Sequence, residues 1–241
     1  MEASFSFLHN RPLLFRQFKN NKKMALRYNF NFAIGIPTIN QWDLLKDTIN
    51  RYSINFPCTD LFIVDNGHQD IKIDPRDHFI HVIKNCKAKS VAESWNQLSR
   101  LIFYKADYAL ILNDDVFLNR KEHEIRQLIY LHSNADFFRA ASGFHSFILP
   151  KSTFNKIGCF DINFKGAYFE DNDYWRRMEL ANCNIICPQL LNPEVIKESA
   201  SINKDPGLNK HYQANHDYYI KKWGGLRGGE KYDKPFNDLI I

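Results

Sequence analysis

The sequence contains little cysteine and no recognisable cysteine pattern. Its five cysteines, an odd number, include no pair in CxxC spacing. A disulfide framework and a structural zinc site are therefore not expected, because both use paired, closely spaced cysteines. This cysteine usage fits a reducing compartment, and we expect a cytoplasmic protein.

Long apolar runs are also missing. No window approaches the ~18 to 20 apolar residues of a membrane span, and His9, Asn10 and Arg11 interrupt the first apolar stretch. Neither an integral membrane protein nor a secretory signal is expected. Residues 1–29 are predicted to be an N-terminal extension. Two interpretations of it stay open: an arm packed on the domain, and a weak peripheral contact with a membrane surface.

A large excess of charge of one sign is missing as well, since 32 Lys and Arg residues are nearly balanced by 27 Asp and Glu residues. The net charge is +5, and the basic residues are dispersed except in KNNKK at residues 19–23. This pattern does not predict a nucleic-acid-binding surface. A mildly positive potential does favour a substrate that carries phosphate.

What the sequence does contain is an alternation of apolar strands and helical segments from residue 30 onward. Helices are expected at residues 40–54 and 90–104, where Ser90 and Glu93 form a capping-box pattern. We predict an α/β fold: a single Rossmann-like domain over residues 30–241, with a mostly parallel central sheet flanked by helices. The expected strands are residues 31–36, 60–64, 79–83, 107–112, 145–149 and 184–187.

Polar residues follow three of these strands directly. Thr38 follows the first strand, Asp65 ends the second, and Asn113, Asp114 and Asp115 end the buried run YALIL. In an open parallel sheet, ligands bind at the carboxyl ends of the strands. Each cluster also has a simpler interpretation as a turn or cap. Together they predict one crevice that can hold a divalent cation, which prefers oxygen ligands.

A fourth cluster lies in GAYFEDNDYWRRMELANCNI at residues 166–185. Glu170, Asp171 and Asp173 crowd the start of an amphipathic helix, with aromatic residues such as Trp175 beside them. Helix capping accounts for one or two of the acids, because the macrodipole favours negative charge there. Three acids among aromatic rings also suit a sugar, with one carboxylate acting as general base.

In order and spacing, IGIPTIN, FIVDNG, NDDV, GCFDINF with FEDNDYWRRM, and NHDYYIKKWGG resemble motifs of the inverting family 2 glycosyltransferases of GT-A fold, especially rhamnosyltransferase-like members. The resemblance covers about residues 30–225. On the donor side, it implies that Thr38 and Asp65 line the pocket for base and ribose and that Asn96 faces the nucleotide. NDDV is similar to the family's DxD motif, with Asn113 in first place and Asp114 supporting the ribose or the metal shell.

The same resemblance implies a Mn²⁺ or Mg²⁺ ion bound directly by Asp115. The family often supplies a later histidine to the metal or pyrophosphate, whereas this sequence has Lys197 and Glu198 in the expected region. His211 and His216 are alternative sources of that ligand.

On the acceptor side, the resemblance implies that Asp171 is the general base. Trp175 and Arg177 would then lie beside the acceptor, next to the Glu170 and Asp171 pair. His145 is either an acceptor contact or a core histidine.

The glycine-rich segment 223–231 is interpreted as a loop or lid. Lys221, Lys222 and Arg227 near it are either surface cations or cations that close over the pyrophosphate.

The sequence thus predicts an inverting hexosyltransferase that moves a sugar from a UDP- or dTDP-linked donor to a hydroxyl acceptor. A non-catalytic sugar- or nucleotide-binding module of the same fold is the alternative. A nucleotidyltransferase fits less well, because GIPTINQWD lacks the glycine-rich, basic loop that this chemistry uses after the first strand.

Overall fold

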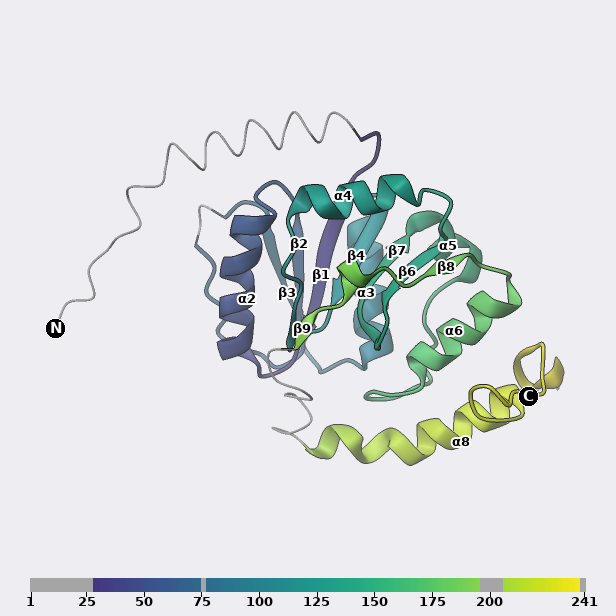
Figure 1. Cartoon of the computed structure of the whole chain (residues 1–241). Helices are drawn as coiled ribbons and strands as arrows, with labels where there is room; N and C mark the ends of the chain where they lie inside the picture. Colours follow the sequence, from purple (N-terminus) through teal and green to yellow (C-terminus); the bar gives the residue numbers. More distant parts are fainter. Residues whose placement is uncertain (1–27, 75–76, 196–205, 239–241) are drawn as a thin grey trace, which may run out of the picture.

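The computed structural model describes residues 28–74, 77–195 and 206–238 and has the predicted α/β architecture (Figure 1). A seven-stranded sheet forms its centre, in the order β3-β2-β1-β4-β7-β6-β8, and β5 pairs with β9 in a small second sheet. The strands are β1 (Phe32–Thr38), β2 (Leu61–Asp65), β3 (Ile80–Lys84), β4 (Tyr108–Leu112), β5 (Val116–Phe117), β6 (Phe137–Ala140), β7 (Gly143–Pro150), β8 (Ile185–Ile186) and β9 (Glu194–Val195). The helices are α2 (Trp42–Asn55), α3 (Val91–Phe103), α4 (Glu122–Leu131), α5 (Lys151–Ile157), α6 (Glu170–Leu180) and α8 (Tyr212–Trp223), with 3₁₀ turns η1 (Gln189–Leu191), η2 (Pro206–His211) and η3 (Pro235–Asp238).

The direction of the strands determines where polar residues meet. β3, β2, β1 and β4 are parallel neighbours, whereas β7 runs antiparallel between β4 and β6. The carboxyl ends of β1, β2 and β4 and the start of β7 therefore share one edge. The chain order reverses at β1, which lies between β2 and β4, and such a switch point is where open α/β sheets bind ligands.

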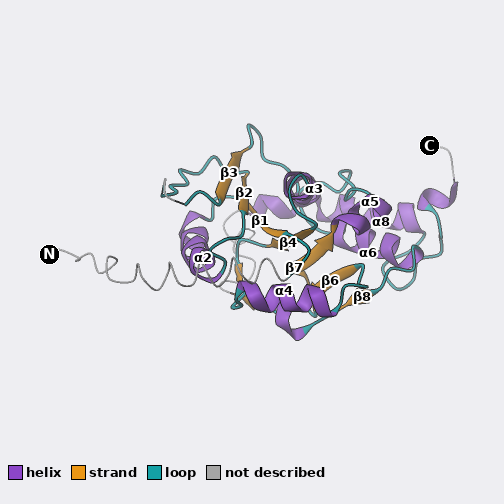
Figure 2. Cartoon of the chain, turned by 90° about the horizontal axis from the view of Figure 1, so that it is seen from above, coloured by secondary structure: helices purple, strands orange, loops and turns teal. Residues whose placement is uncertain are grey.

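Two apolar layers cover the sheet. Ile34 and Ile36 of β1 pack with α2 and α4 on one face, and Ala33 packs with α3, α5 and α6 on the other. Figure 2 shows α3 and α4 on opposite sides of the sheet. Burial on both faces explains why the strands are almost continuously apolar rather than alternating.

The sequence prediction located β1, β2, β3, β4, β7 and the short β8. β5, β6 and β9 were not predicted, and they have two, four and two residues. β5 pairs with β9 about 80 residues later, with Val116 opposite Val195. A pair of this kind leaves no local periodicity, because its partner is chosen by tertiary packing.

Most of the predicted N-terminal extension lies outside the described residues. Tyr28, which belongs to it, packs against Tyr130 of α4 with ring centroids 5.5 Å apart. Within the described ranges, no helix combines the length and the apolarity that crossing a bilayer requires.

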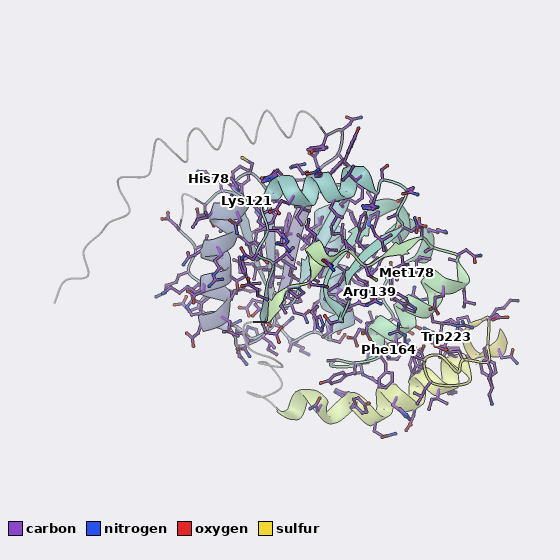
Figure 3. All side chains as sticks on the ribbon, in the orientation of Figure 1. His78, Lys121, Arg139, Phe164, Met178 and Trp223 are labelled. Atoms are coloured by element: carbon purple, nitrogen blue, oxygen red, sulfur yellow. The ribbon has the colours of Figure 1, made fainter. Side chains whose placement is uncertain are left out.

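Helix α8 is fastened to the domain through a buried acid of α6, Asp173. Its carboxylate oxygen Oδ1 lies 2.6 Å from Lys222 Nζ and accepts a 3.0 Å hydrogen bond from Trp223 Nε1. Lys222 also reaches Asp161 Oδ2 at 2.7 Å. Trp223 packs with Phe164, and Figure 3 shows both between α8 and the rest of the domain. Lys222 is therefore neither a surface cation nor part of a lid.

Replacing Lys222 by Met is expected to lower the free energy of unfolding by about 3 kcal/mol, because Asp161 and Asp173 lose their shared buried cation. Chemical denaturation measures the change. Lys221→Met is the control, since Lys221 is exposed on the same helix, and its effect should stay within about 0.5 kcal/mol. Equal stability of the two variants would contradict a structural role for Lys222.

Candidate active site

Thr38 and Asp65 are neighbours at the ends of β1 and β2, where they are register partners. Asp65 is fully buried, and its two carboxylate oxygens accept hydrogen bonds of 2.8 Å from the backbone N–H groups of Gly67 and Gln69. The Gln69 side-chain amide donates to Thr38 Oγ1 at 3.3 Å and to Asp65 Oδ1 at 3.2 Å. Asp65 thus organises the turn after β2, and Gln69, which was not predicted, joins it to Thr38.

Asp114 lies at the end of the neighbouring strand β4 and is 6% exposed. The Thr38 hydroxyl hydrogen-bonds to it, and the backbone N–H of Ile39 approaches its Oδ2 at 3.4 Å. Burial raises the pKa of Asp114 to about 7; the Thr38 hydrogen bond opposes this and the negative charge of Asp115 adds to it. Asp115 itself is half-buried. The structure therefore brings Thr38, Asp65 and Asp114 together at one edge of the sheet.

A chain of amide side chains supports this edge of the sheet. Asn66 Nδ2 donates to Ser94 Oγ at 3.0 Å, and Asn85 Nδ2 donates to Asn66 Oδ1 at 2.8 Å. Asn85 and Gln97 also exchange hydrogen bonds of 3.1 Å. None of these residues was predicted to belong to the site. Ser94 and Gln97 belong to the helix that the capping box predicted, but nothing local to the sequence indicated that they face the end of β2.

The start of α6 is built on an unusual backbone. Tyr168 and Phe169 have φ angles of 80° and 72°, a left-handed conformation that is costly for bulky residues. Asn215 of α8 holds the preceding loop: its Nδ2 donates to the carbonyls of Lys165, Ala167 and Tyr168. Packing of α8 therefore stabilises a strained turn that ends at Glu170 and Asp171.

Two adjacent carboxyl groups follow this turn. Glu170 is buried, and burial together with the charge of Asp171 raises its pKa to about 8. Burial also raises the pKa of Asp171, while the Asn172 backbone N–H and the charges of Arg227 and His145 oppose the shift. Asp171 is half-buried, so it is the more accessible of the two. At neutral pH, a pKa of about 8 keeps Glu170 mostly protonated.

His145 links the two acidic clusters. Its backbone carbonyl accepts a 2.9 Å hydrogen bond from the Asn113 N–H, immediately before Asp114. Its side chain is half-buried at the start of β7, close enough for its charge to act on Asp171. His145 is therefore bonded to the NDDV segment through its backbone and acts electrostatically on the start of α6.

Two other predicted residues, Asn96 and Arg177, have strong structural partners. Asn96 is buried and exchanges 2.8 Å hydrogen bonds with the backbone of Phe160. Arg177 binds Asp173 and donates to the carbonyls of Ile157 and Cys159. Through these bonds, Asn96 and Arg177 hold the backbone around residues 157–160 in place.

Trp175 also has close neighbours. The guanidinium groups of Arg139 and Arg227 lie 4.4 Å and 4.9 Å from its ring centroid, and its Nε1–H donates to Glu179.

The acids after β4 suit a divalent cation that prefers oxygen ligands. Among the described residues, no group of three His, Cys, Asp or Glu side chains is arranged to hold a metal. Asp114 and Asp115 nevertheless provide adjacent hard oxygens, and Asp114 is held in a buried position where negative charge is costly. Mg²⁺ and Mn²⁺ commonly use one or two carboxylates and complete their shell with substrate phosphates. The residues therefore fit such an ion as an incomplete site.

Four further residues were predicted near the metal or pyrophosphate: Lys197, Glu198, His211 and His216. Lys197 and Glu198 lie outside the described residues. His211 ends η2, and His216 contacts Asp217 Oδ1 through Nδ1 at 2.8 Å.

In sequence, no family model matches the chain, and no curated protein matches it. In structure, it is similar to a mannosyltransferase from Pyrobaculum calidifontis in complex with GDP-Man and Mn²⁺, with a TM-score of 0.58 and 10% identity over 86% of this chain and 69% of that one. It is also similar to S. aureus TarS, with a TM-score of 0.53 and 11% identity over 79% of this chain, and to GalNAc-T7 with UDP, GalNAc and Mn²⁺, with a TM-score of 0.54 and 8% identity over 80% of this chain.

The chain spans only 42% of TarS and 51% of GalNAc-T7. At this level of identity, the likeness concerns the fold alone. The chain has the fold of GT-A glycosyltransferases.

Proposed function

We propose that the protein is an inverting glycosyltransferase that moves a sugar from a nucleoside diphosphate sugar to a hydroxyl of a glycan, lipid-linked or protein acceptor. One observation carries the proposal: His145 accepts a backbone hydrogen bond from Asn113, next to the acids after β4, and acts electrostatically on Asp171 at the start of α6. A donor diphosphate and an acceptor hydroxyl bound at these two clusters would meet at one point. A role in polysaccharide synthesis would follow.

The donor would bind at the strand ends. Thr38 and Asp65 would line the pocket for the base and ribose, held rigid by Gln69 and the amide chain behind it. Asn113 and Asp114 would extend this wall toward the diphosphate. UDP or dTDP is the proposed nucleotide, and the neighbours solved with GDP-Man and with UDP support nucleotide binding at this fold.

Asp115, with support from Asp114, would hold Mn²⁺ or Mg²⁺. Bound there, the ion would supply electrostatic stabilisation of the charge that develops on the leaving nucleoside diphosphate. Two of the neighbours were solved with Mn²⁺, which supports the choice of metal.

Asp171 would act as the general base. Its carboxylate would take the proton from the acceptor hydroxyl while that oxygen attacks the anomeric carbon from the face opposite the diphosphate, which inverts the configuration. Glu170, protonated at neutral pH, could hydrogen-bond a second acceptor hydroxyl and keeps the negative charge on Asp171. Trp175 would border the acceptor, with His145 between donor and acceptor.

A non-catalytic binding module of the same fold is the competing proposal. It would need the donor pocket but not the base. The raised pKa of Asp171 favours the enzyme, because a proton acceptor with a pKa closer to working pH is a better base than an ordinary aspartate.

Donor binding tests both proposals. Thermal melting with UDP, dTDP, GDP and CMP nucleotides and their sugars, each with Mn²⁺, Mg²⁺ or EDTA, should show a metal-dependent rise in melting temperature for UDP or dTDP ligands, because ligands that bind the native state stabilise it. Asp115→Ala should abolish the metal dependence. Stabilisation of that variant equal to wild type, with metal and with EDTA, would exclude Asp115 as the metal ligand.

Asp171→Asn separates the enzyme from the module. It should keep the donor-induced rise in melting temperature and reduce transfer, measured as nucleoside diphosphate release with acceptor present, by about 10² to 10⁴-fold. Asp47→Asn, an exposed acid on α2, is the control and should keep full turnover. Unreduced turnover in Asp171→Asn would remove this residue as the base.

Glu170→Gln tests whether folding raises the pKa of Glu170. Because folding holds a proton on Glu170 that the unfolded chain loses near pH 4.3, the wild type should lose stability as pH rises from 5 to 8 and level off above about 8. The expected loss is on the order of 2 to 4 kcal/mol, and the Gln variant should lack it. Chemical denaturation at pH 5, 7 and 8.5 measures the difference. Parallel pH profiles of the two proteins would show that Glu170 ionises normally.

A further inference from the structure

A groove of about 500 Å³ lies at the far end of α6 from the acidic pair, lined by Arg176, Glu179, Arg227, Gly228 and Glu230. It is formed by α6 on one side and by the loop after α8 on the other. None of its lining residues belongs to the strand ends that make up the donor pocket. The proposed donor pocket therefore does not explain the groove.

Hydrogen bonds hold two of the lining residues, Glu230 and Arg176, in place. Glu230 Oε1 accepts a hydrogen bond from the Tyr219 hydroxyl at 2.5 Å, and its Oε2 accepts one from the Gly228 N–H at 2.7 Å. Arg176 Nη2 donates to the Tyr232 carbonyl at 3.0 Å. Lys231 and Tyr232 both donate their backbone N–H to the Trp223 carbonyl, which closes the loop at its base.

The loop also depends on glycine for its shape. A Cβ at Gly225 would lie 2.1 Å from the Gly229 carbonyl oxygen, and Gly224 has a φ of 77° with the Tyr232 ring beside it. The chain turns back on itself at these glycines, and Arg227 and Gly228 in the same loop line the groove. The glycine-rich segment thus forms one wall of the groove, and Arg227 on this wall and Glu179 on the opposite wall of α6 are exposed.

The lining carries two guanidinium and two carboxylate groups, so it has no net charge. A phosphate or a carboxylated ligand would meet as much repulsion as attraction. Planar charged groups that offer paired donors and paired acceptors instead suit neighbouring hydroxyls of a neutral sugar. The chemistry of the groove therefore favours a polyhydroxylated, uncharged ligand.

Arg227 connects the groove to the proposed base. Its Nη1 lies 3.5 Å from Asn172 Oδ1, its charge acts on Asp171, and it lies over Trp175, whose Nε1–H donates to Glu179. Asp171 and Glu179 are eight residues apart on α6, which is about 12 Å along the helix axis. A ligand that reaches from one to the other must be longer than a single sugar.

Building on the proposed function, we infer that the groove is an acceptor subsite for a neutral oligosaccharide. The chain end that receives the sugar lies at Asp171, and a sugar further back in the acceptor lies between Glu179 and Arg227. The enzyme would then prefer oligosaccharide acceptors to the corresponding monosaccharides.

Saturation-transfer NMR tests the inference directly. The probes are glucose, galactose, mannose and rhamnose, neutral di- to tetrasaccharides built from them, and uronic-acid and phosphorylated counterparts. The wild type should bind at least one neutral oligosaccharide about ten-fold or more tighter than its monosaccharide. Glu179→Ala should remove about ten-fold of that preference, and Glu179→Gln, which can still accept from Trp175, should restore part of it. Asp47→Ala should bind as wild type.

Equal oligosaccharide affinity in wild type and Glu179→Ala would overturn the subsite, as would the absence of oligosaccharide binding to wild type. Preferred binding of the acidic or phosphorylated probes would overturn the neutral ligand class. Donor-induced melting shifts on the same samples separate the two proposals. Oligosaccharide binding without any donor shift would leave the subsite standing and count against the transferase, whereas a donor shift without oligosaccharide binding would count against the subsite alone.

Discussion

The buried carboxylate of Asp173 is the interaction on which the arrangement of the site depends. It is completely buried and receives Arg177 from its own helix and Lys222 and Trp223 from α8. A charge at this depth is tolerated only when donors replace its lost hydration. Because those donors come from two helices, the same contact positions α6 with its acidic start and α8 with the loop that follows it.

Strain and charge are both concentrated where α6 begins. Tyr168 and Phe169 keep a left-handed backbone because Asn215 holds the carbonyls before them. Asp114 and Glu170 are acids whose burial raises their pKa values. Perturbed acids of this kind gather at functional sites more often than elsewhere. Under the proposed function, a cation beside Asp114 and an acceptor beside Asp171 would relieve part of that electrostatic cost.

The predictable part of the fold came from local patterns. The buried runs of β1, β2 and β4 are unbroken, and the Ser90 and Glu93 capping box forms as predicted, with Glu93 N–H donating to Ser90 Oγ at 3.2 Å. Asn96 and Arg177 were harder to interpret. Their residue types suit ligand binding, but their hydrogen bonds go to the Phe160 backbone and to Asp173. Phe160 is 64 residues from Asn96 in the sequence, whereas Asp173 lies one turn before Arg177 on the same face of α6.

The sequence by itself determined the alternation of strands and helices and the acids that end them, because burial and capping are properties of short segments. Only the tertiary structure decided which acids meet. The antiparallel placement of β7 brings His145 to Asn113 at the end of β4, where its charge acts on Asp171. The docking of α8 turns Lys222 from an apparent surface cation into a buried one and closes the glycine-rich loop into a wall. These outcomes depend on contacts between residues far apart in the chain, and no local pattern specifies them.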